Sequence, residues 1–508
     1  MKFLKGALLL ALAGIICRLL GVVVRIPLAN IVGNYGMGLY QMVFPLYALL
    51  LIISSAGIPV ALSKLIASNK ASPKQILFNA VLLMTVVGAI VSALFMLFAY
   101  NIAALQGNRA VGIIYMAIAP AVLLVCVLSA FRGYFQGAQN MLPTATSQII
   151  EQLVKLAFAL GLALWFIKTS VVLAVFGAIL AVTISEAVAL VYLIILYALH
   201  HKKDKSKFSF KISFPLIWQI IKTAVPITLM ASIFPLILVM DSMFIINMLH
   251  HAGASHHEAT QLFGISSGTV HTLVNLPAVL GAAVATAVVP CVSKLKKENQ
   301  TEQLRKSMSH AIQITVLVSI FFTVFYLVFA QTIVDLLYHN AFRAHGAHLV
   351  LAGRLLMIES ALIFLMAASA VFTAMLQGLD RARFPLIALL VGGAVKIAFQ
   401  FAFIGQLGIY AVSIANVLCF ALAALINTIF ALRALKIPRC TFANLARLVA
   451  LTTLFALAVR LSAMAWPDNR WLLLAKGALA LGLYLILLAL FRFLRFNRSN
   501  VGNNLQQK

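Results

Sequence analysis

Two arginine residues interrupt an otherwise apolar segment near the start of the chain. Arg18 and Arg25 are seven residues apart, about two helical turns, so both guanidinium groups would project from nearly the same face, roughly 10 Å apart along the axis. A charge at the centre of a membrane-spanning helix costs roughly 2.5–3.5 kcal/mol on insertion scales, so charges there are functional candidates. Planar guanidinium groups suit the oxygens of a phosphate-type anion. The pair is therefore a predicted anion contact, and snorkelling or pairing with a buried acid is the alternative.

A second polar group lies in the stretch RGYFQGAQNMLPTATSQIIEQLVKL, residues 132–156. Gln148, Glu151, Gln152 and Lys155 fall on one side of a helix with 3.6 residues per turn. Glu151 and Lys155 are placed to pair with each other, which would let the helix face a wet cavity. The alternative interpretation is that Lys155 contacts phosphate or sugar while Glu151 sets the charge of that site.

Other charged residues lie inside apolar segments farther along the chain. Asp241 is a candidate counter-charge for Lys396, which lies in a different apolar segment. Glu186 lies in a third segment, and Arg354 shares a fourth with Glu359. Intramembrane charges mark either a substrate pathway or a contact that joins helices, so these residues are predicted cavity or coupling charges.

The elements that position these residues are long apolar segments. Hydrophobic residues make up 63% of the 508 residues, 10% are charged, and the mean hydropathy is +1.07. Runs of about 20 apolar residues recur along the chain, the length that a spanning helix needs. The sequence predicts an all-α polytopic membrane protein with about 14 transmembrane helices. They are expected near 7–31, 39–62, 76–100, 110–131, 145–167, 169–199, 216–249, 262–290, 308–331, 348–376, 384–406, 408–435, 445–465 and 470–495.

The net charge of +27 is unevenly distributed between the two sides of the predicted membrane. With the N-terminus inside, most of the Lys and Arg residues lie in inner segments, and the outer segments hold only Arg109, Lys168, Arg343 and Arg470. This asymmetry follows the positive-inside rule and puts both termini in the cytoplasm. The basic charge sets topology and attracts anionic lipid headgroups, and it does not indicate nucleic acid binding.

A weak internal repeat predicts the domain organisation. The tripeptide SKL closes the second span at 63–65 and the eighth at 293–295, and the dipeptide QG follows the fourth span at 136–137 and the tenth at 377–378. Two six-helix lobes related as parallel repeats would bind substrate between them near the bilayer midplane. The predicted domains are an N-terminal lobe 1–201, a basic cytoplasmic linker 202–215, a C-terminal lobe 216–437, and two additional helices with a basic tail at 438–508.

A family resemblance rests on two motifs, GNYGMGLYQMVFPLYALLLIISSAGIPVALSKLIA at 33–67 and RGYFQGAQNMLPTATSQIIEQ at 132–152. Both resemble the stage V sporulation protein B and lipid II flippase branch of the multidrug/oligosaccharidyl-lipid/polysaccharide exporter superfamily. The resemblance covers the whole chain, although the C-terminal half is matched mainly by its layout. It implies a bacterial plasma-membrane protein that moves undecaprenyl-pyrophosphate-linked saccharides, including lipid II, from the inner to the outer leaflet.

The resemblance also bears on individual residues. Flippases of this type carry cavity-facing arginines on their first helix, which agrees with Arg18 and Arg25. Some relatives bind sodium with an acidic residue on the seventh helix, a position that Asp241 could match. Span 11 here brings Lys396 and no carboxylate, so the sequence departs from that pattern and sodium dependence is in question. The two last spans would form a groove for the prenyl tail.

Missing motifs argue against an enzyme. The chain has no GxxxxGK[ST] motif for a nucleotide, and no DxD pair or long outer loop to house a glycosyltransferase site. No cofactor is expected. Because the sequence has no such nucleotide motif, the expected driving force is the membrane potential, an ion gradient or consumption of the product. Adjacent histidines in the loop 250–260 rarely converge on one ion, and the five cysteines are scattered, so neither a metal nor a disulfide is expected.

Three alternatives to a lipid II flippase stay open at this point. The first is a flippase for another wall, capsule or exopolysaccharide unit. The second is a cation-coupled multidrug exporter, although a cationic substrate would favour a more acidic cavity than one containing Arg18, Arg25 and Lys155. The third is a non-transporting scaffold of a wall-synthesis complex. Expected partners are the lipid-linked saccharide, membrane lipid and wall-synthesis proteins.

Overall fold

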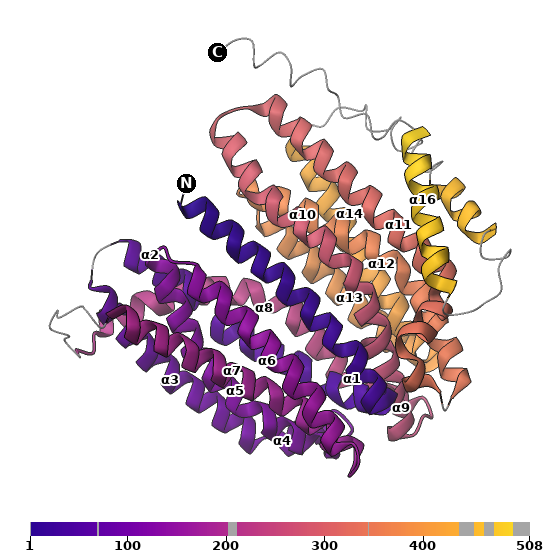
Figure 1. Ribbon diagram of the computed structural model, residues 1–508, viewed down its shortest axis with the longest axis horizontal. Coiled ribbons are helices and arrows are strands. Elements are labelled where there is room, and N and C mark those ends of the chain that lie inside the picture. The colour runs from indigo at the N-terminus through magenta and orange to yellow at the C-terminus, as the bar shows by residue number, and fades with distance from the viewer. Residues whose placement is uncertain are drawn as a thin grey trace. The chain divides into compact units, whose positions relative to one another are not determined.

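The computed structural model of the chain describes residues 2–68, 71–201, 211–343, 345–435, 452–461 and 472–490 (Figure 1). Within these ranges every regular element is a helix. Eleven of the helical stretches are long and apolar enough to cross a membrane. The prediction of an all-α polytopic membrane fold is confirmed for this part of the chain.

The first helix, α1 (Lys2–Ser55), is two helices joined at a bend. Gly33 at the bend has φ 68° and ψ −176°, a backbone conformation that residues with a Cβ rarely adopt. The bend separates the first two predicted spans, which belong to one stretch, Leu12–Ala67. Counting the two arms of α1 separately turns the eleven stretches into twelve helices. The shorter apolar helices Thr452–Leu461 and Ala475–Leu488 bring the number in the described residues to the predicted fourteen.

The helices that follow α1 in the first half of the chain are α2 (Ile58–Ala67), α3 (Pro73–Leu97), α4 (Ala99–Leu105), η1 (Arg109–Val111), α5 (Gly112–Gly137), α6 (Leu142–Phe166), α7 (Val171–His201), α8 (Phe214–His251) and α9 (His256–Phe263). A π-helical segment, η2 (Gly264–Val270), continues α9 into α10 (His271–Lys297). The remaining described helices are α11 (Thr301–Phe342), α12 (Gly346–Gly378), α13 (Arg383–Leu407), α14 (Tyr410–Leu435), the short helix Thr452–Leu461 and α16 (Leu473–Leu490).

The chain divides into two compact units. The first contains Met1–Val279, Asn340–His345 and Leu389–Cys419, and the second contains Leu280–His339, Gly346–Ala388 and Phe420–Lys508. Each unit has its own apolar core among the described residues. In the first, buried side chains of α2, α3, α5, α7 and α8 pack together, and in the second those of α10, α11, α12 and α14 do so.

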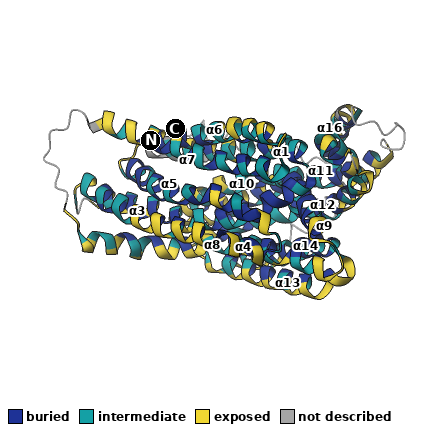
Figure 2. Cartoon of the chain, turned by 90° about the horizontal axis from the view of Figure 1, so that it is seen from below, coloured by how far each residue is buried: buried dark blue, intermediate teal, exposed yellow. Residues whose placement is uncertain are grey.

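Small residues let the helices of the first unit approach closely. A Cβ at Gly137 would lie 2.8 Å from Ile66, so α5 and α2 touch at this position with only hydrogen on the glycine. Many large apolar residues are exposed on the helices, and Figure 2 colours all exposed residues yellow. On α3 they recur at helical spacing, with Val86 50%, Ile90 55% and Leu94 49% exposed. Such a face is stable in lipid, where apolar surface costs nothing to expose.

The bend of α1 carries polar contacts to distant parts of the first unit. Asn30 Oδ1 accepts a hydrogen bond from the Asn340 backbone N–H at 3.1 Å, and Asn34 Nδ2 donates to the Ala341 carbonyl at 3.3 Å. Tyr35 stacks on His257 of α9 with 4.3 Å between ring centroids. These contacts hold the chain at the bend to residues far away in the sequence.

The predicted division into lobes, linker and helix pair stays a prediction. Residues 202–210 of the linker, and residues 436–451, 462–471 and 491–508 of the last part, lie outside the described residues. The ends of the two last predicted spans, 445–465 and 470–495, also fall in those ranges, and the expected prenyl-tail groove stays a prediction.

Candidate functional site

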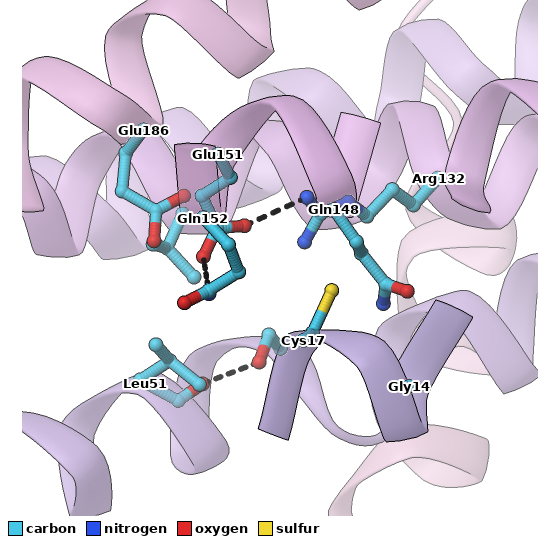
Figure 3. Close-up of a pocket in the computed structure, with 10 residues that line it drawn as sticks. Gly14, Cys17, Leu51, Arg132, Gln148, Glu151, Gln152 and Glu186 are labelled. Atoms are coloured by element: carbon cyan, nitrogen blue, oxygen red, sulfur yellow. Dashed lines mark hydrogen bonds and ion pairs between the residues drawn. The ribbon is translucent and has the colours of Figure 1, made fainter. Parts of the chain in front are cut away.

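A polar cavity of about 180 Å³ lies in the first unit, among α1, α5, α6 and α7. Figure 3 shows Gln148 and Gln152 of α6 on one side and Cys17 of α1 opposite them. The residues that line the cavity are Gly14, Cys17, Leu51, Ser55, Val125, Arg132, Gln148, Glu151, Gln152 and Glu186. Gln148, Glu151 and Gln152 of the polar stripe seen in the sequence therefore form the cavity wall that α6 supplies, while Lys155 is not among the lining residues.

The local sequence explains why α6 presents these residues together. Pro143 occupies the first turn of α6, where a missing backbone N–H leaves no hydrogen bond unmade. The helix then runs without interruption, so Gln148, Glu151 and Gln152 point toward the same side. Gln152 also lies beside α1, since a Cβ at Gly21 would be 3.9 Å from its Oε1 atom.

Glu151 is held between two cations. Its Oε2 atom accepts a hydrogen bond from Arg132 Nη2 at 2.9 Å, and its Oε1 atom lies 3.9 Å from Lys155 Nζ. Gln152 Nε2 donates to the same Oε1 atom at 3.1 Å. The expected pair between Glu151 and Lys155 forms, but the shorter contact comes from Arg132 on a different helix.

Arg132 lines the cavity but is not among the site residues predicted from the sequence. The predicted span ends at residue 131, which puts Arg132 outside the membrane-spanning segment. In the structure α5 continues to Gly137, with Tyr134 and Phe135 buried in the core. Arg132 is therefore part of the helix, and its Nε atom also donates to Ser147 Oγ at 3.1 Å. The only sequence signal was its place at the head of the motif at 132–152.

Glu186 of α7 completes the polar wall, with only 2% of the residue exposed. Tyr47 donates its hydroxyl hydrogen to Glu186 Oε1 at 3.2 Å. The other carboxylate oxygen, Oε2, is buried and has no hydrogen-bond partner. Glu186 and Glu151 therefore share one cavity in very different surroundings.

The two predicted arginines of the first helix lie outside the lining of this cavity. Arg18 is exposed, one residue beyond the cavity-lining Cys17. Arg25 is half-buried, with its guanidinium carbon 4.8 Å from the centroid of the Phe44 ring. Gly14 and Cys17 put the same helix arm on the cavity wall, while the predicted role of both arginines stays a prediction.

Asp241 of α8 and Lys396 of α13 form a buried ion pair in the same unit. Lys396 Nζ lies 2.5 Å from Asp241 Oδ2, and Gln400 Nε2 donates to Asp241 Oδ1 at 3.1 Å. The helices can approach because Gly393 lies against Ile237, where a Cβ would be 2.5 Å from its Cδ1 atom. Both carboxylate oxygens are engaged, so the structure supplies the counter-charge that the sequence proposed for Lys396.

Arg354 and Glu359 of α12 belong to the second unit and have different surroundings. Arg354 is exposed, whereas Glu359 is fully buried. The histidine-rich loop makes local contacts, with His250 stacked on His256 at 3.8 Å between ring centroids. Neither group lines the cavity around Glu151.

Comparison with known proteins provides an independent line of information. Residues 3–296 match the family described as "Polysaccharide biosynthesis protein", and residues 226–402 match the MatE family. The chain is 28% identical over 436 residues to Stage V sporulation protein B of Bacillus subtilis (strain 168), covering 84% of this chain and 82% of that protein. It is 26% identical over 432 residues to Lipid II flippase MurJ of the same organism, covering 78% and 77%.

Solved structures share the fold at lower identity. The inward closed conformation of Lipid II flippase MurJ has a TM-score of 0.74 at 14% identity, covering 95% of this chain and 98% of that one. The inward-facing conformation of a multidrug resistance MATE family transporter of the MOP superfamily has a TM-score of 0.66 at 13% identity, covering 83% and 94%.

Proposed function

The chain belongs to the polysaccharide biosynthesis protein family, and from that membership we propose that it is a flippase for an undecaprenyl-pyrophosphate-linked saccharide. The proposed substrate is the peptidoglycan precursor lipid II or a close relative of it. The substrate would cross from the inner to the outer leaflet of the bacterial plasma membrane by alternating access, with both termini cytoplasmic. The similarity to a lipid II flippase in sequence and in fold supports this choice.

The observation that carries the proposal is the contact between Arg132 and Glu151 at the cavity wall. The guanidinium binds a carboxylate through Nη2 at 2.9 Å, so this donor is directed at an oxyanion. A phosphate oxygen has the same hydrogen-bonding requirement and would replace Glu151 as the acceptor. Lys155, 3.9 Å from the other oxygen of Glu151, supplies a second positive charge.

Arg18 and Arg25 extend the proposed site along α1. The arm of α1 that carries them also lines the cavity through Gly14 and Cys17. A pyrophosphate bears charge on both phosphoryl groups, more than Arg132 alone neutralises. We therefore assign Arg18 and Arg25 to the path of the headgroup into and out of the cavity. Neutralising the headgroup lowers the desolvation cost of crossing, which is the main barrier to unaided flipping.

The buried pair of Asp241 and Lys396 supports a transport cycle without sodium. A sodium site needs several oxygen ligands, and both oxygens of Asp241 are already bound to Lys396 and Gln400. In this proposal Lys396 stands in place of a bound cation. The membrane potential or consumption of the product then drives the cycle.

The test is translocation of labelled lipid II in proteoliposomes that contain the purified full chain. We expect flipping by the wild type, and a loss of about 10-fold or more in Arg132→Gln, because the oxyanion loses its charged hydrogen-bond donor. Arg18→Gln/Arg25→Gln should also lose flipping. Arg109→Gln, at an exposed position predicted to lie outside, is the matched control and should flip normally.

The outcomes separate the alternatives. Normal flipping by Arg132→Gln would overturn the assigned site. Flipping of a different lipid-linked saccharide, with none of lipid II, would keep the site and change the substrate. If the wild type flips neither lipid II nor another lipid-linked saccharide, and cells that carry cavity variants still synthesise their wall normally, the protein would be a non-transporting scaffold of a wall-synthesis complex.

A multidrug exporter is the second candidate, and the observation that favours it is the acidic side of the cavity. Glu186 and Glu151 could attract an organic cation instead of a phosphate. Cys17 lines the cavity, so its reaction with an aqueous thiol reagent reports occupancy. Protection of Cys17 by a pyrophosphate and not by a cationic dye would support the flippase, and the reverse pattern would support the exporter.

A further inference from the structure

Glu186 differs from the other buried carboxylate of the cavity in having no cation within ion-pair distance among the described residues. Glu151 has Arg132 at 2.9 Å and Lys155 at 3.9 Å. Glu186 has one hydrogen bond, from the neutral Tyr47 hydroxyl, and its Oε2 atom is buried without a partner. An ionised carboxylate in such a position is expensive, because it is buried and no cation of the described residues lies within ion-pair distance to compensate for its charge.

The groups around Glu186 come from three other helices. Tyr47 faces it from α1, Glu151 and Lys155 from α6, and Arg132 from α5. With both acids ionised, the two cations and two carboxylates balance. That balance holds only while the cavity contains no other charge.

An anionic substrate group upsets this balance. When it accepts hydrogen bonds from Arg132, it displaces Glu151, which keeps only the longer contact to Lys155. Two carboxylates and the bound anion then share two cations in a small, partly dry space. Binding one proton would remove one of these negative charges. Protonation is most favourable at Glu186, because in the described part of the chain Glu186 has no cation within ion-pair distance whose attraction would be lost.

We propose that Glu186 is a proton-binding site, which takes up a proton from water in the cavity when an anionic group binds Arg132 and releases it when that group leaves. The inference rests on the proposed function, because it requires Arg132 to bind an anion. It makes Glu186 a coupling residue, by which the transport cycle of the flippase responds to pH. The proton forms an O–H bond at the carboxylate, and no other bond changes.

The test measures protons taken up when a probe binds to the purified full chain in detergent. Farnesyl pyrophosphate is the probe, since it carries the anionic headgroup on a short prenyl chain. Calorimetric titrations in two buffers of different ionisation enthalpy give the number of protons bound per probe. We expect the wild type to bind nearly one proton for each molecule of farnesyl pyrophosphate that it binds. Glu186→Gln should still bind the probe, but the number of protons bound with it should fall to near zero.

Two further variants separate the carboxylate from its surroundings. Tyr47→Phe removes the hydrogen bond to Oε1 and keeps the carboxylate, so proton uptake should persist. Glu302→Gln changes an acid that is exposed and outside the cavity, and it should leave uptake unchanged. Uptake that remains in Glu186→Gln, or binding to the wild type without uptake, would overturn the proposal.

A second measurement uses the wild type alone, in case Glu186→Gln does not fold. Dicyclohexylcarbodiimide reacts with protonated carboxyl groups in apolar surroundings, and mass spectrometry locates the product. Labelling of Glu186 should rise several-fold when the probe binds, and unchanged labelling would overturn the inference. No binding of the probe by the wild type would instead overturn the anion site itself, and the inference with it.

Discussion

At the scale of single residues, Glu151 acts as a resident counter-ion for the proposed phosphate site. One of its oxygens is bound to Arg132 and the other lies 3.9 Å from Lys155. Because Glu151 already accepts a hydrogen bond from Arg132, a phosphate oxygen would have to compete with the carboxylate for the same donor. The competition keeps binding reversible, which transport requires.

This arrangement predicts an unusual response to Glu151→Gln. Loss of the competing charge should tighten binding of farnesyl pyrophosphate, by about 10-fold if one charge-assisted contact of roughly 1.4 kcal/mol is released. Flipping should slow, because the headgroup dissociates from the site more slowly. Calorimetric titration gives the Kd and the proteoliposome assay gives the rate, with Gln148→Ala as a cavity-lining control. Weaker binding by Glu151→Gln would mean that Glu151 positions Arg132 and does not compete with the substrate.

The Asp241–Lys396 pair makes a prediction about stability. Removing one partner leaves an unpaired charge with little solvent access, since the two side chains are 10% and 4% exposed. Asp241→Asn alone should lower the free energy of unfolding by about 3–5 kcal/mol, while Asp241→Asn/Lys396→Met should recover most of it. Thermal unfolding in detergent measures both variants. If the double variant is no more stable than Asp241→Asn, the loss of stability does not come from leaving Lys396 unpaired.

The Asp241–Lys396 pair also makes a prediction about whether flipping is coupled to sodium. If Lys396 stands in place of a cation, replacing sodium by potassium or choline should leave wild-type flipping unchanged. A sodium requirement would contradict that interpretation without affecting the stability prediction.

At the scale of elements, the bend of α1 is the feature that joins its two arms to the rest of the first unit. Gly33 supplies the positive φ, and Asn34 next to it binds the carbonyl of Ala341. The bend joins the first two predicted spans on their predicted outer side, and alternating access requires that contacts on one side of the membrane break when the other side closes. The bend is therefore the predicted position of an outer gate.

A cross-link tests that role. In a background with every cysteine replaced by serine, Asn34→Cys/Ala341→Cys should form a disulfide under oxidation. Flipping should then stop, because the contact between Asn34 and Ala341 can no longer open, and a reducing agent should restore it. The single variants under the same oxidant are the controls. Unimpaired flipping by the cross-linked chain would show that this contact stays closed through the cycle.

At the scale of the whole molecule, family and fold agree with the resemblance that the two N-terminal motifs indicated. The family match covers residues 3–296, and the fold matches that of a lipid II flippase at a TM-score of 0.74. At 14% identity this likeness establishes the architecture alone. In the proposed function the substrate depends on the few polar residues of the cavity, so variants of those residues and a change of ligand test it.

The amino-acid sequence by itself determined the class, the number of helices and the likeness to polysaccharide exporters. Hydropathy and helical period act along the chain, so the apolar runs, and the pairing of Glu151 with Lys155 four residues later, could be read without a fold. The candidate pairing of Asp241 with Lys396 was also within reach, since few charges were available to balance each other inside the membrane.

Only the tertiary structure decided which charges share a cavity. Arg132 reaches Glu151 because α5 extends past its apolar run and lies beside α6, and Glu186 joins them from α7. Arg18 and Arg25 share a helix with the cavity wall, yet neither lines the cavity. The physical reason is that contacts between helices depend on how each helix is rotated and shifted against its neighbours. Packing of many side chains sets those quantities, and no local spacing in the sequence encodes them.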